Sequence, residues 1–222
     1  MAHEFKNMLV TGLHDRALKE MAARYLHGRV IDIGCGTKPY ESLLAPMVEE
    51  HVGVDLPDGV HGSYRVDIAA DAYSIPVPDE SFDGAICTAV LEHLEEPARA
   101  LGECFRLLRP GAVAIYSAPF IWHLHEEPRD FFRYSKYGLT YLAEQAGFEV
   151  VEMKPLSGFW VTFGQLLVYS LYRAHRGRLG RLPVIPAVGL AIQVVALGLN
   201  RIDRAEQWPW MYMAAFRKPE HP

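Results

Sequence analysis

The stretch RVIDIGCGTKPY at residues 29–40 constrains the fold more than any other part of the chain. A short β-branched run contains the acid Asp32 and is followed by Gly34 and Gly36, with one residue between the two glycines. In α/β proteins, glycines directly after a strand let a ligand lie against bare backbone at the carboxyl edge of a parallel sheet. The stretch therefore predicts a strand followed by a ligand-binding loop.

The sequence around this stretch alternates helical and strand patterns up to about residue 154. Apolar residues recur at helical spacing within 14–26, 97–111 and 135–148, where Pro110-Gly111 is expected to stop the second helix, Ser135 to cap the third and Gly147 to end it. Short apolar runs that predict strands lie at 29–34, 51–56, 82–88, 112–119, 149–154 and 210–218. This order predicts an α/β fold with a doubly wound, mostly parallel, seven-stranded Rossmann-like sheet, in which the last strand is an edge strand.

The composition changes after residue 154. The segments 155–172 and 182–200 contain no charged side chain, and an arginine-rich stretch joins them. We expect a core at 1–154, an apolar helical insertion at 155–204, and a final strand with a tail at 205–222. Three interpretations of the insertion stay open: a cover or homodimer face, helices in a membrane interface with arginines at the headgroups, and a spanning hairpin. Spanning fits least, because the loop arginines would cross the membrane and Pro183 and Pro186 interrupt the second segment.

Charge and cysteine usage limit the function classes. The 22 Lys and Arg against 27 Asp and Glu give a net charge of -5, which argues against nucleic acid as a partner. The three cysteines are an odd number at wide spacings, which fits neither a disulfide framework nor paired metal knuckles. The N-terminal stretch has no apolar core of signal-peptide length, so a cytoplasmic location is predicted.

The glycine loop itself narrows the ligand class. Pro39 stands where the third glycine of a dinucleotide motif would be, and no Gly-Lys-Ser/Thr of a P-loop follows the strand. Asp55 ends the second strand, where an acid can accept hydrogen bonds from two ribose hydroxyls. The sequence therefore predicts a nucleoside ligand without a diphosphate.

Four blocks in this order carry a family resemblance: VIDIGCGTKPY, GVDLPDG, ADAYSIPVPDESFDGAICTAVLEHL and LLRPGAVAIYSAP. They resemble the class I S-adenosylmethionine-dependent methyltransferases of the type-11 kind, over roughly residues 14–154. The resemblance implies S-adenosylmethionine as cofactor. It also implies cofactor-binding roles, with the methionine part at Asp32, Gly34, Cys35 and Gly36, the ribose and adenine at Asp55, Leu56, Asp71 and Ala72, and the sulfonium near Cys87 and Thr88. Simple packing is the alternative for the two cysteines.

The segment 120–139, FIWHLHEEPRDFFRYSKYGL, is the predicted acceptor site, and part of it resembles a segment found in a subset of this family. The candidates for a catalytic base are His123, His125 and His93, and local hydrogen bonding is the alternative role for each. The candidates for substrate contact are Trp122, Arg129, Asp130, Arg133 and Tyr134, with a structural ion pair as the alternative for the charged three. His123 and His125 with the glutamates that follow could bind a metal, but the sequence offers no distant third ligand, so no metal site is predicted.

The predicted function is methyl transfer, with a small, hydrophobic or lipid-like acceptor methylated on oxygen. The transfer depends mainly on positioning, and a hydroxyl acceptor additionally requires a base. A nicotinamide-dependent oxidoreductase is an alternative that Pro39 and the block at 71–83 disfavour. A non-catalytic interaction or membrane-docking module is a second alternative, although such a relative should have lost the glycines or Asp55. Peripheral contact with the inner face of a membrane, through 155–204, also stays open.

Overall fold

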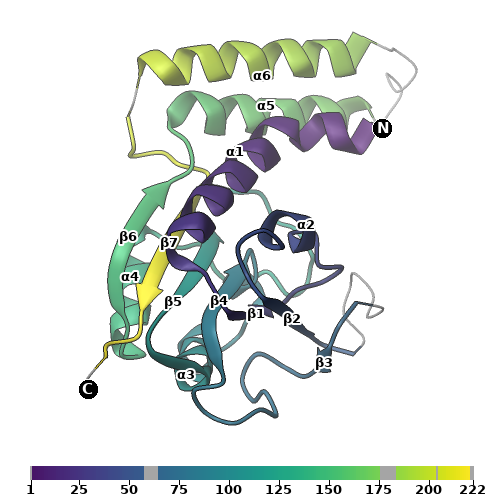
Figure 1. Cartoon of the computed structure of the whole chain (residues 1–222). Coiled ribbons are helices and arrows are strands. Elements are labelled where there is room, and N and C mark those ends of the chain that lie inside the picture. The colour runs from purple at the N-terminus through teal and green to yellow at the C-terminus, as the bar shows by residue number, and fades with distance from the viewer. Residues whose placement is uncertain (1, 58–64, 176–183, 204, 221–222) are drawn as a thin grey trace. The chain divides into compact units, whose positions relative to one another are not determined.

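The computed structural model describes residues 2–57, 65–175, 184–203 and 205–220. Its sheet has seven strands in the order β3-β2-β1-β4-β5-β7-β6 (Figure 1). The strands are β1 (Arg29–Ile33), β2 (Glu50–Asp55), β3 (Ile68–Ala69), β4 (Phe82–Thr88), β5 (Leu108–Pro119), β6 (Glu149–Pro155) and β7 (Met211–Arg217). The helices are α1 (Ala2–Tyr25), α2 (Glu41–Leu44), the 3-10 turn η1 (Leu91–His93), α3 (Pro97–Leu107), α4 (Lys136–Gln145), α5 (Phe159–His175) and α6 (Val184–Ile202).

The centre of the sheet is parallel and buried. β1 pairs with β2 on one side and with β4 on the other, and β4 pairs with β5, all in parallel register. Val30 and Ile31 of β1 are 0% exposed, as an apolar run with both faces covered requires. The prediction of a mostly parallel seven-stranded Rossmann-like sheet is confirmed.

The prediction that the last strand lies at an edge is wrong. β7 lies between β5 and β6. The Gly111 N–H donates to the Lys218 carbonyl near one end of β5, and the Phe120 N–H donates to the Trp210 carbonyl at the other, so β7 runs antiparallel to β5. Met213 to Phe216 are all 0% exposed. A continuous apolar run of this kind suits an interior strand better than an edge, where one side of the backbone is unpaired.

The predicted helix ends are partly correct. The Ser135 hydroxyl accepts a hydrogen bond from the Gly138 N–H at 3.1 Å, and Gly147 has φ +98 after α4, which confirms both caps. Pro110-Gly111 does not stop α3, which already ends at Leu107. Leu108 is extended and pairs with Phe82, so the proline falls in the first residues of β5, where its missing N–H is tolerated.

The described chain forms two compact units. The sheet unit contains residues 18–119, 124–154 and 212–222, and the helical unit contains residues 1–17, 120–123 and 155–211. These boundaries differ from the predicted division at 154 and 204, because residues 1–17, 120–123 and 205–211 group with the apolar helices. The predicted insertion is therefore one part of a larger helical unit.

Within the helical unit, α5 and α6 pack closely. A Cβ on Gly164 would lie 2.7 Å from the Ala196 Cβ, so the glycine allows the two helices to approach. Two buried glutamines fix α1 to this pair: Gln165 Nε2 donates to the Lys6 carbonyl at 2.8 Å, and the Leu9 N–H donates to Gln193 Oε1 at 3.0 Å. Buried amides of this kind specify one arrangement, because an unmatched amide in an apolar contact is costly.

The prolines do not act as expected in the second apolar segment. Pro186 lies in the first turn of α6, where a missing backbone N–H costs nothing. The prediction that it interrupts the segment is wrong. Pro183 and the loop arginines Arg176, Arg178 and Arg181 lie outside the described residues.

Candidate functional site

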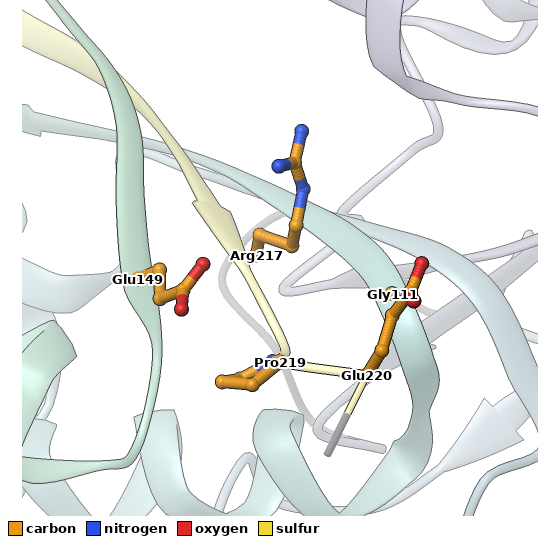
Figure 2. Close-up of a pocket in the computed structure, with 5 residues that line it drawn as sticks. All are labelled: Gly111, Glu149, Arg217, Pro219 and Glu220. Atoms are coloured by element: carbon orange, nitrogen blue, oxygen red, sulfur yellow. The ribbon is translucent and has the colours of Figure 1, made fainter. Parts of the chain in front are cut away.

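One pocket of the sheet unit lies at the wrong edge for the predicted ligand. Figure 2 shows its lining, which comes from the beginning of β5 and β6 and from the chain at the end of β7. The lining residues are Gly111, Glu149, Arg217, Pro219 and Glu220. Ligands of open α/β sheets bind at the carboxyl ends of the parallel strands. This pocket is at the amino end of β5, and no predicted site residue lines it.

The glycine loop follows the carboxyl end of β1 and is held by backbone. The N–H groups of Gly34 and Cys35 both donate to the Val54 carbonyl, at 2.8 and 3.1 Å. Gly34 has φ +75, and a Cβ there would lie 2.4 Å from the side chain of Val90. The glycine therefore also makes room for the chain after β4, a role that the sequence did not indicate.

Asp55 is fixed beside this loop. Its Oδ2 accepts from the Gly36 N–H at 2.7 Å, and its Oδ1 accepts from the Leu56 N–H at 2.7 Å. A carboxylate oxygen has further lone pairs, so two vicinal hydroxyls can still be bound in this orientation. Leu56 is 37% exposed and can cover an aromatic base. The arrangement fits the predicted nucleoside.

Asp32, which was predicted to line the methionine part of the cofactor, is buried. It lies inside β1 and is 1% exposed, and its Oδ2 is 3.0 Å from His51 Nε2 of β2. Burial raises the pKa of Asp32, and the hydrogen bond from His51 opposes that rise. Asp32 therefore contacts His51 in this structure, and its predicted contact with the methionine part stays a prediction.

The cysteines near the loop are buried. Cys35 is 3% exposed and Cys87 is 1% exposed. Burial raises the pKa of Cys35 to about 12 and that of Cys87 well above its ordinary value, so both are neutral thiols near pH 7. This supports packing rather than redox chemistry.

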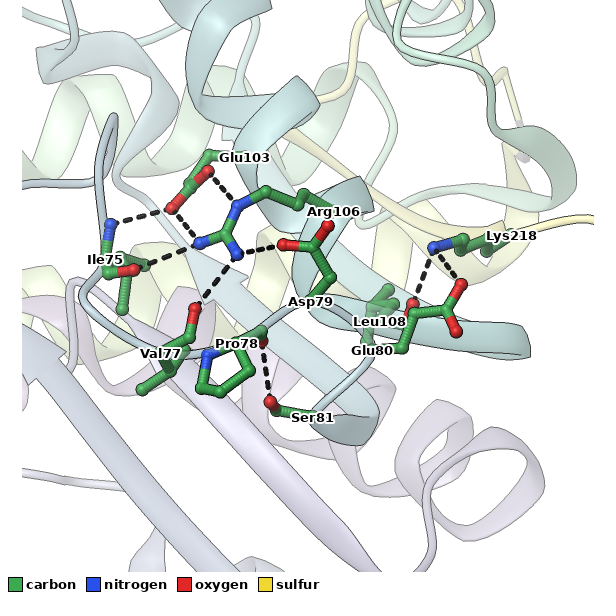
Figure 3. A network of polar contacts seen from close by, with 10 residues as sticks. All are labelled: Ile75, Val77, Pro78, Asp79, Glu80, Ser81, Glu103, Arg106, Leu108 and Lys218. Carbon is green, nitrogen blue, oxygen red and sulfur yellow. Dashed lines mark hydrogen bonds and ion pairs between the residues drawn. The ribbon is translucent and has the colours of Figure 1, made fainter.

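Asp71 and Ala72 follow β3, and the loop after them is anchored from α3. Asp71 Oδ1 accepts from the N–H groups of Tyr73 and Ser74, at 2.8 and 2.9 Å. Figure 3 shows Arg106 at the centre of a polar network. Its guanidinium donates to the Ile75 and Val77 carbonyls at 3.0 and 2.9 Å and to the carboxylates of Asp79 and Glu103. A loop without regular structure is thereby held in place.

Thr88 ends β4 half-buried, and the next residue, Ala89, is exposed with φ 54. A left-handed conformation is costly for alanine, and such strain is found most often at functional sites. β4 lies next to β1, with Ile86 opposite Asp32. The ends of β1, β2, β3 and β4 therefore bring the predicted cofactor residues to one edge of the sheet.

A compact group of ionisable side chains follows β4. Glu92 and His93 lie on η1, and His125 reaches them from the chain after β5. His93 Nε2 and His125 Nε2 are each 3.9 Å from Glu92 Oε1, and the two imidazole rings meet edge to face at 4.8 Å. We call these three residues the Glu92–His93–His125 cluster. Both histidines were predicted from the sequence as candidates for a catalytic base. Glu92, which is 0% exposed, was not predicted as a site residue.

The outer nitrogens of both histidines face acceptors. His93 Nδ1 is hydrogen-bonded to the carbonyl of Arg129, and His125 Nδ1 is 3.5 Å from Asp130 Oδ2. A carbonyl can only accept, so His93 Nδ1 carries the proton and its Nε2 presents a lone pair. Arg133 donates to both oxygens of Asp130, at 2.6 and 2.7 Å, and thereby lowers the pKa of that carboxyl.

The chain around residues 124–134 closes over Glu92. The N–H groups of Phe131 and Phe132 donate to the Glu92 carbonyl, at 2.8 and 3.3 Å, and the Tyr134 hydroxyl donates to the Leu91 carbonyl at 2.9 Å. Burial raises the pKa of Glu92 to about 8. The Asp130–Arg133 contact supports the interpretation of these two residues as a structural ion pair. The Tyr134 hydroxyl donates within the protein, to the Leu91 carbonyl, and its predicted contact with substrate stays a prediction. The side chain of Arg129 is exposed.

Two predicted residues belong to the helical unit. The His123 ring lies 4.4 Å from Tyr169 and 5.1 Å from Trp122, and Trp122 lies 4.9 Å from Trp210, all between ring centroids. His123 and Trp122 are thus part of an aromatic cluster with α5. The structure brings together two of the three histidine candidates, His93 and His125, within the sheet unit.

Comparisons with known proteins agree with this architecture. Residues 31–133 match a family model described as a methyltransferase domain. A probable S-adenosylmethionine-dependent methyltransferase of Mycolicibacterium smegmatis is 33% identical over 149 residues, which are 62% of this chain and 58% of that protein. A ubiquinone biosynthesis O-methyltransferase of Pseudomonas fluorescens is 30% identical over 102 residues, which are 40% of this chain and 43% of that protein. The chain thus spans about half the length of these relatives.

The solved structures support the fold alone. The cyclase SpnF is 22% identical with a TM-score of 0.60, and the match covers 92% of this chain and 80% of that one. A cyclase shares this fold, so the fold by itself does not determine the reaction.

Proposed function

Because this chain carries a class I S-adenosylmethionine-dependent methyltransferase domain, we propose that it methylates a hydroxyl oxygen of a small, hydrophobic acceptor. Asp55 and the loop from Gly34 to Gly36 hold the cofactor in this proposal. Their fit rests on the orientation of the Asp55 carboxylate, which the Gly36 and Leu56 N–H groups fix beside the glycine loop. In this proposal Leu56, which is 37% exposed, covers the adenine.

The observation that carries the oxygen acceptor is the Glu92–His93–His125 cluster. It begins at Glu92, four positions after Thr88, and the family resemblance places Cys87 and Thr88 near the sulfonium. Both imidazoles direct Nε2 inward, while their Nδ1 atoms face acceptors. A neutral imidazole in this orientation can accept a proton from a hydroxyl group. An amine or carboxylate acceptor would not require such a group.

The chemistry divides between positioning and proton removal. When bound, S-adenosylmethionine supplies an electrophilic methyl group, so the acceptor oxygen forms the new C–O bond while the C–S bond breaks and its electron pair remains on sulfur. Holding the acceptor in line accounts for most of the acceleration. The hydroxyl proton passes to an Nε2 atom of the cluster and then to solvent, a contribution of roughly 10²–10⁴-fold in rate.

The hydrophobic character of the acceptor is argued from the chain beside the cluster. Leu124 is 67% exposed, Phe131 is 42% exposed and Phe132 is 38% exposed. The backbone N–H groups of the two phenylalanines donate to the Glu92 carbonyl, which places both residues beside the cluster. Exposed aromatic rings next to a few convergent polar groups suit an aromatic hydroxyl compound. The Pseudomonas fluorescens relative is named as an O-methyltransferase, which agrees with this class.

Labelled-methyl transfer tests the proposal. The purified protein is incubated with methyl-labelled S-adenosylmethionine and matched sets of catechols, hydroquinones, aromatic amines and aromatic carboxylates, and mass spectrometry locates the label. We expect ether products, with turnover reduced about 10²–10⁴-fold in His93→Gln or His125→Gln. His123→Gln is the matched control and should keep parental turnover. Label on nitrogen or carboxylate alone, or full activity in both cluster variants, would contradict the proposal.

Helix α6 has an exposed apolar surface that bears on where the protein is located in the cell. The segment Ile185–Ile202 of α6 is long and apolar enough to cross a membrane, by length and composition only, with a mean hydropathy of 1.6 and 17% of it buried. Val194 and Val195 are 62% and 61% exposed. We propose a cytoplasmic enzyme whose α6 meets another apolar surface. Flotation with neutral and anionic liposomes, beside sedimentation without lipid, separates a membrane interface from a dimer face, and a monomer that never floats contradicts both.

A further inference from the structure

Three ligand-type atoms of the sheet unit converge outside the predicted cofactor residues. One carboxylate oxygen of Glu92 and one ring nitrogen each of His93 and His125 lie within 4.8 Å of one another. We propose that this cluster binds a divalent first-row transition-metal ion, of the class of Zn²⁺, Mn²⁺ or Fe²⁺. Two imidazoles and one carboxylate form a ligand set that these ions accept.

The buried carboxylate is an independent observation that points to a ligand. Glu92 is 0% exposed, and neither of its carboxylate oxygens has a hydrogen-bond partner among the described residues. His93 Nε2 is likewise a buried nitrogen without a hydrogen-bond partner in the described chain, and carboxylate oxygens of Glu92 and Glu126 lie 3.9 and 3.8 Å from it. Buried polar atoms are nearly always satisfied, and a lone buried carboxylate is costly. A cation between Glu92 and His93 satisfies both at once.

The surroundings of the two imidazoles match those of metal ligands. In metal sites, a coordinating histidine usually donates its other N–H to a carbonyl or carboxylate, which fixes the ring. His93 has the Arg129 carbonyl at Nδ1, and His125 has Asp130 at Nδ1. The Asp130 carboxylate in turn accepts hydrogen bonds from the Arg133 guanidinium and from the backbone N–H of His125. Both Nε2 atoms are therefore directed toward Glu92.

The spacing requires a small closure around the ion. Ligand bonds of about 2.0–2.1 Å in a tetrahedral site place neighbouring donor atoms about 3.4 Å apart. The two Nε2 atoms are each 3.9 Å from Glu92 Oε1, and the ligand atoms of the cluster all lie within 4.8 Å of one another, so closure by about 0.5 to 1.4 Å brings them to bonding geometry. Three protein ligands leave at least one position open.

An open position gives the ion a role at the acceptor, and this step rests on the proposed function. An acceptor hydroxyl bound there has a lowered pKa and loses its proton to solvent, since a divalent ion stabilises the oxyanion. In the ion-bound protein, the Nε2 lone pairs are occupied by the ion, so the ion replaces the imidazole base of the proposed function, and only the transfer to a hydroxyl oxygen is retained from that proposal. From the sequence, His123 and His125 were the candidate pair of metal ligands, and no distant third ligand was identified. The structure pairs His125 with Glu92 and His93 instead.

Calorimetry on the intact protein tests the inference. Protein freed of any affinity tag and dialysed against chelator is titrated with Zn²⁺, and Co²⁺ absorption reports the geometry of the bound ion. We expect the parent to bind one equivalent of Zn²⁺. The affinity for Zn²⁺ should fall by about 100-fold in Glu92→Gln and in His125→Gln, and by no less than about 10-fold. His123→Gln should bind as the parent does. The ion should also raise the thermal midpoint of the parent but not of the two cluster variants.

Two outcomes overturn the inference: no stoichiometric binding by the parent, or equal binding by folded Glu92→Gln and His125→Gln. Far-ultraviolet circular dichroism establishes that each variant is folded. The proposed function fails separately. Ion binding without methyl transfer to oxygen would remove the O-methylation proposal and leave the ion site. The opposite result would retain O-methylation and remove the ion site: a parent that binds no ion and whose turnover is unchanged by chelator, together with a His125→Gln variant that has lost turnover.

Discussion

The glycine loop and the chain over Glu92 lie in the same unit, yet different forces hold them. The loop from Gly34 to Lys38 is fixed by backbone N–H groups that donate to Val54 and Cys35 carbonyls and to Asp55. Residues 124–134 are held by backbone bonds to the Glu92 carbonyl and, in addition, by two side-chain contacts, the Asp130–Arg133 ion pair and the Tyr134 hydroxyl. A loop built on backbone tolerates many sequences around a few glycines. A segment that also depends on side chains changes when those side chains are substituted, which suits the part of an enzyme that selects its acceptor.

Gly34→Ala should break the glycine loop and have the largest effect. The residue has φ +75, and a Cβ there would lie 2.4 Å from the Val90 side chain. Left-handed backbone and overpacking each cost about 1–3 kcal/mol, so we expect a loss of about 3 kcal/mol in the free energy of unfolding. Urea denaturation measures it. The matched control is Gly138→Ala, where a Cβ would be 3.6 Å from Ser135 Oγ, and equal unfolding free energies in the two variants would refute the argument.

Asp55→Ala should separate cofactor binding from folding. The carboxylate accepts from two backbone N–H groups at one strand end, and in the proposal it also binds the ribose. We expect S-adenosylmethionine affinity to fall by roughly 1.5–3 kcal/mol, because a charge-assisted hydrogen bond is lost from a half-buried site. Calorimetry with S-adenosylmethionine measures this loss, and Asp55→Asn should show a smaller one. Parental affinity in Asp55→Ala would mean that Asp55 does not contact the cofactor.

The different forces also explain what the sequence could predict. The glycine loop and Asp55 follow a local pattern of strand, glycine and acid, so both were found from neighbouring residues. The burial of Asp32 depends on His51 of the next strand, which the local pattern does not contain. Glu92 was missed for the same reason. A glutamate on a short turn is ordinarily exposed, and here it is buried by a segment more than thirty positions later in the chain, which bonds to its carbonyl. The order of β5, β7 and β6 is likewise a non-local property.

Arg106→Met tests a loop on the cofactor side that depends on side chains. The guanidinium joins two carbonyls and two carboxylates of the 75–81 loop and α3, and its side chain is 32% exposed. We expect a loss of about 2 kcal/mol in the free energy of unfolding, since several charge-assisted hydrogen bonds are removed from a partly buried site. Urea denaturation at neutral pH measures it. An unchanged midpoint would mean that the network contributes nothing to stability.

The same network predicts a response to acid. The hydrogen bond from Arg106 lowers the pKa of Glu103 below its ordinary value of 4.5. The stabilisation from this carboxylate is therefore complete above about pH 4.5 and is lost as the pH falls through the lower pKa of the folded state. Glu103→Gln should be less stable than the parent at pH 7 and should lose less stability between pH 5 and about 3. Parallel stability curves for the two proteins would contradict this assignment.

Tyr134→Phe should have the smallest effect, and it tests whether the acceptor segment can be loosened without touching the cofactor side. The variant removes only the hydroxyl that donates to the Leu91 carbonyl at 2.9 Å, while the ring stays in a site that is 5% exposed. One neutral hydrogen bond contributes about 1 kcal/mol, so the free energy of unfolding should fall by that amount. Turnover should fall as well, because Leu91 begins the turn that carries Glu92 and His93. Affinity for S-adenosylmethionine should not change, because backbone holds the glycine loop independently. Tyr137→Phe, at a side chain that is 74% exposed, is the control and should leave all three quantities at parental values. If Tyr134→Phe weakened cofactor binding as much as it lowered turnover, the two regions would be coupled, and the contrast between a backbone-held and a side-chain-held edge would have no functional meaning.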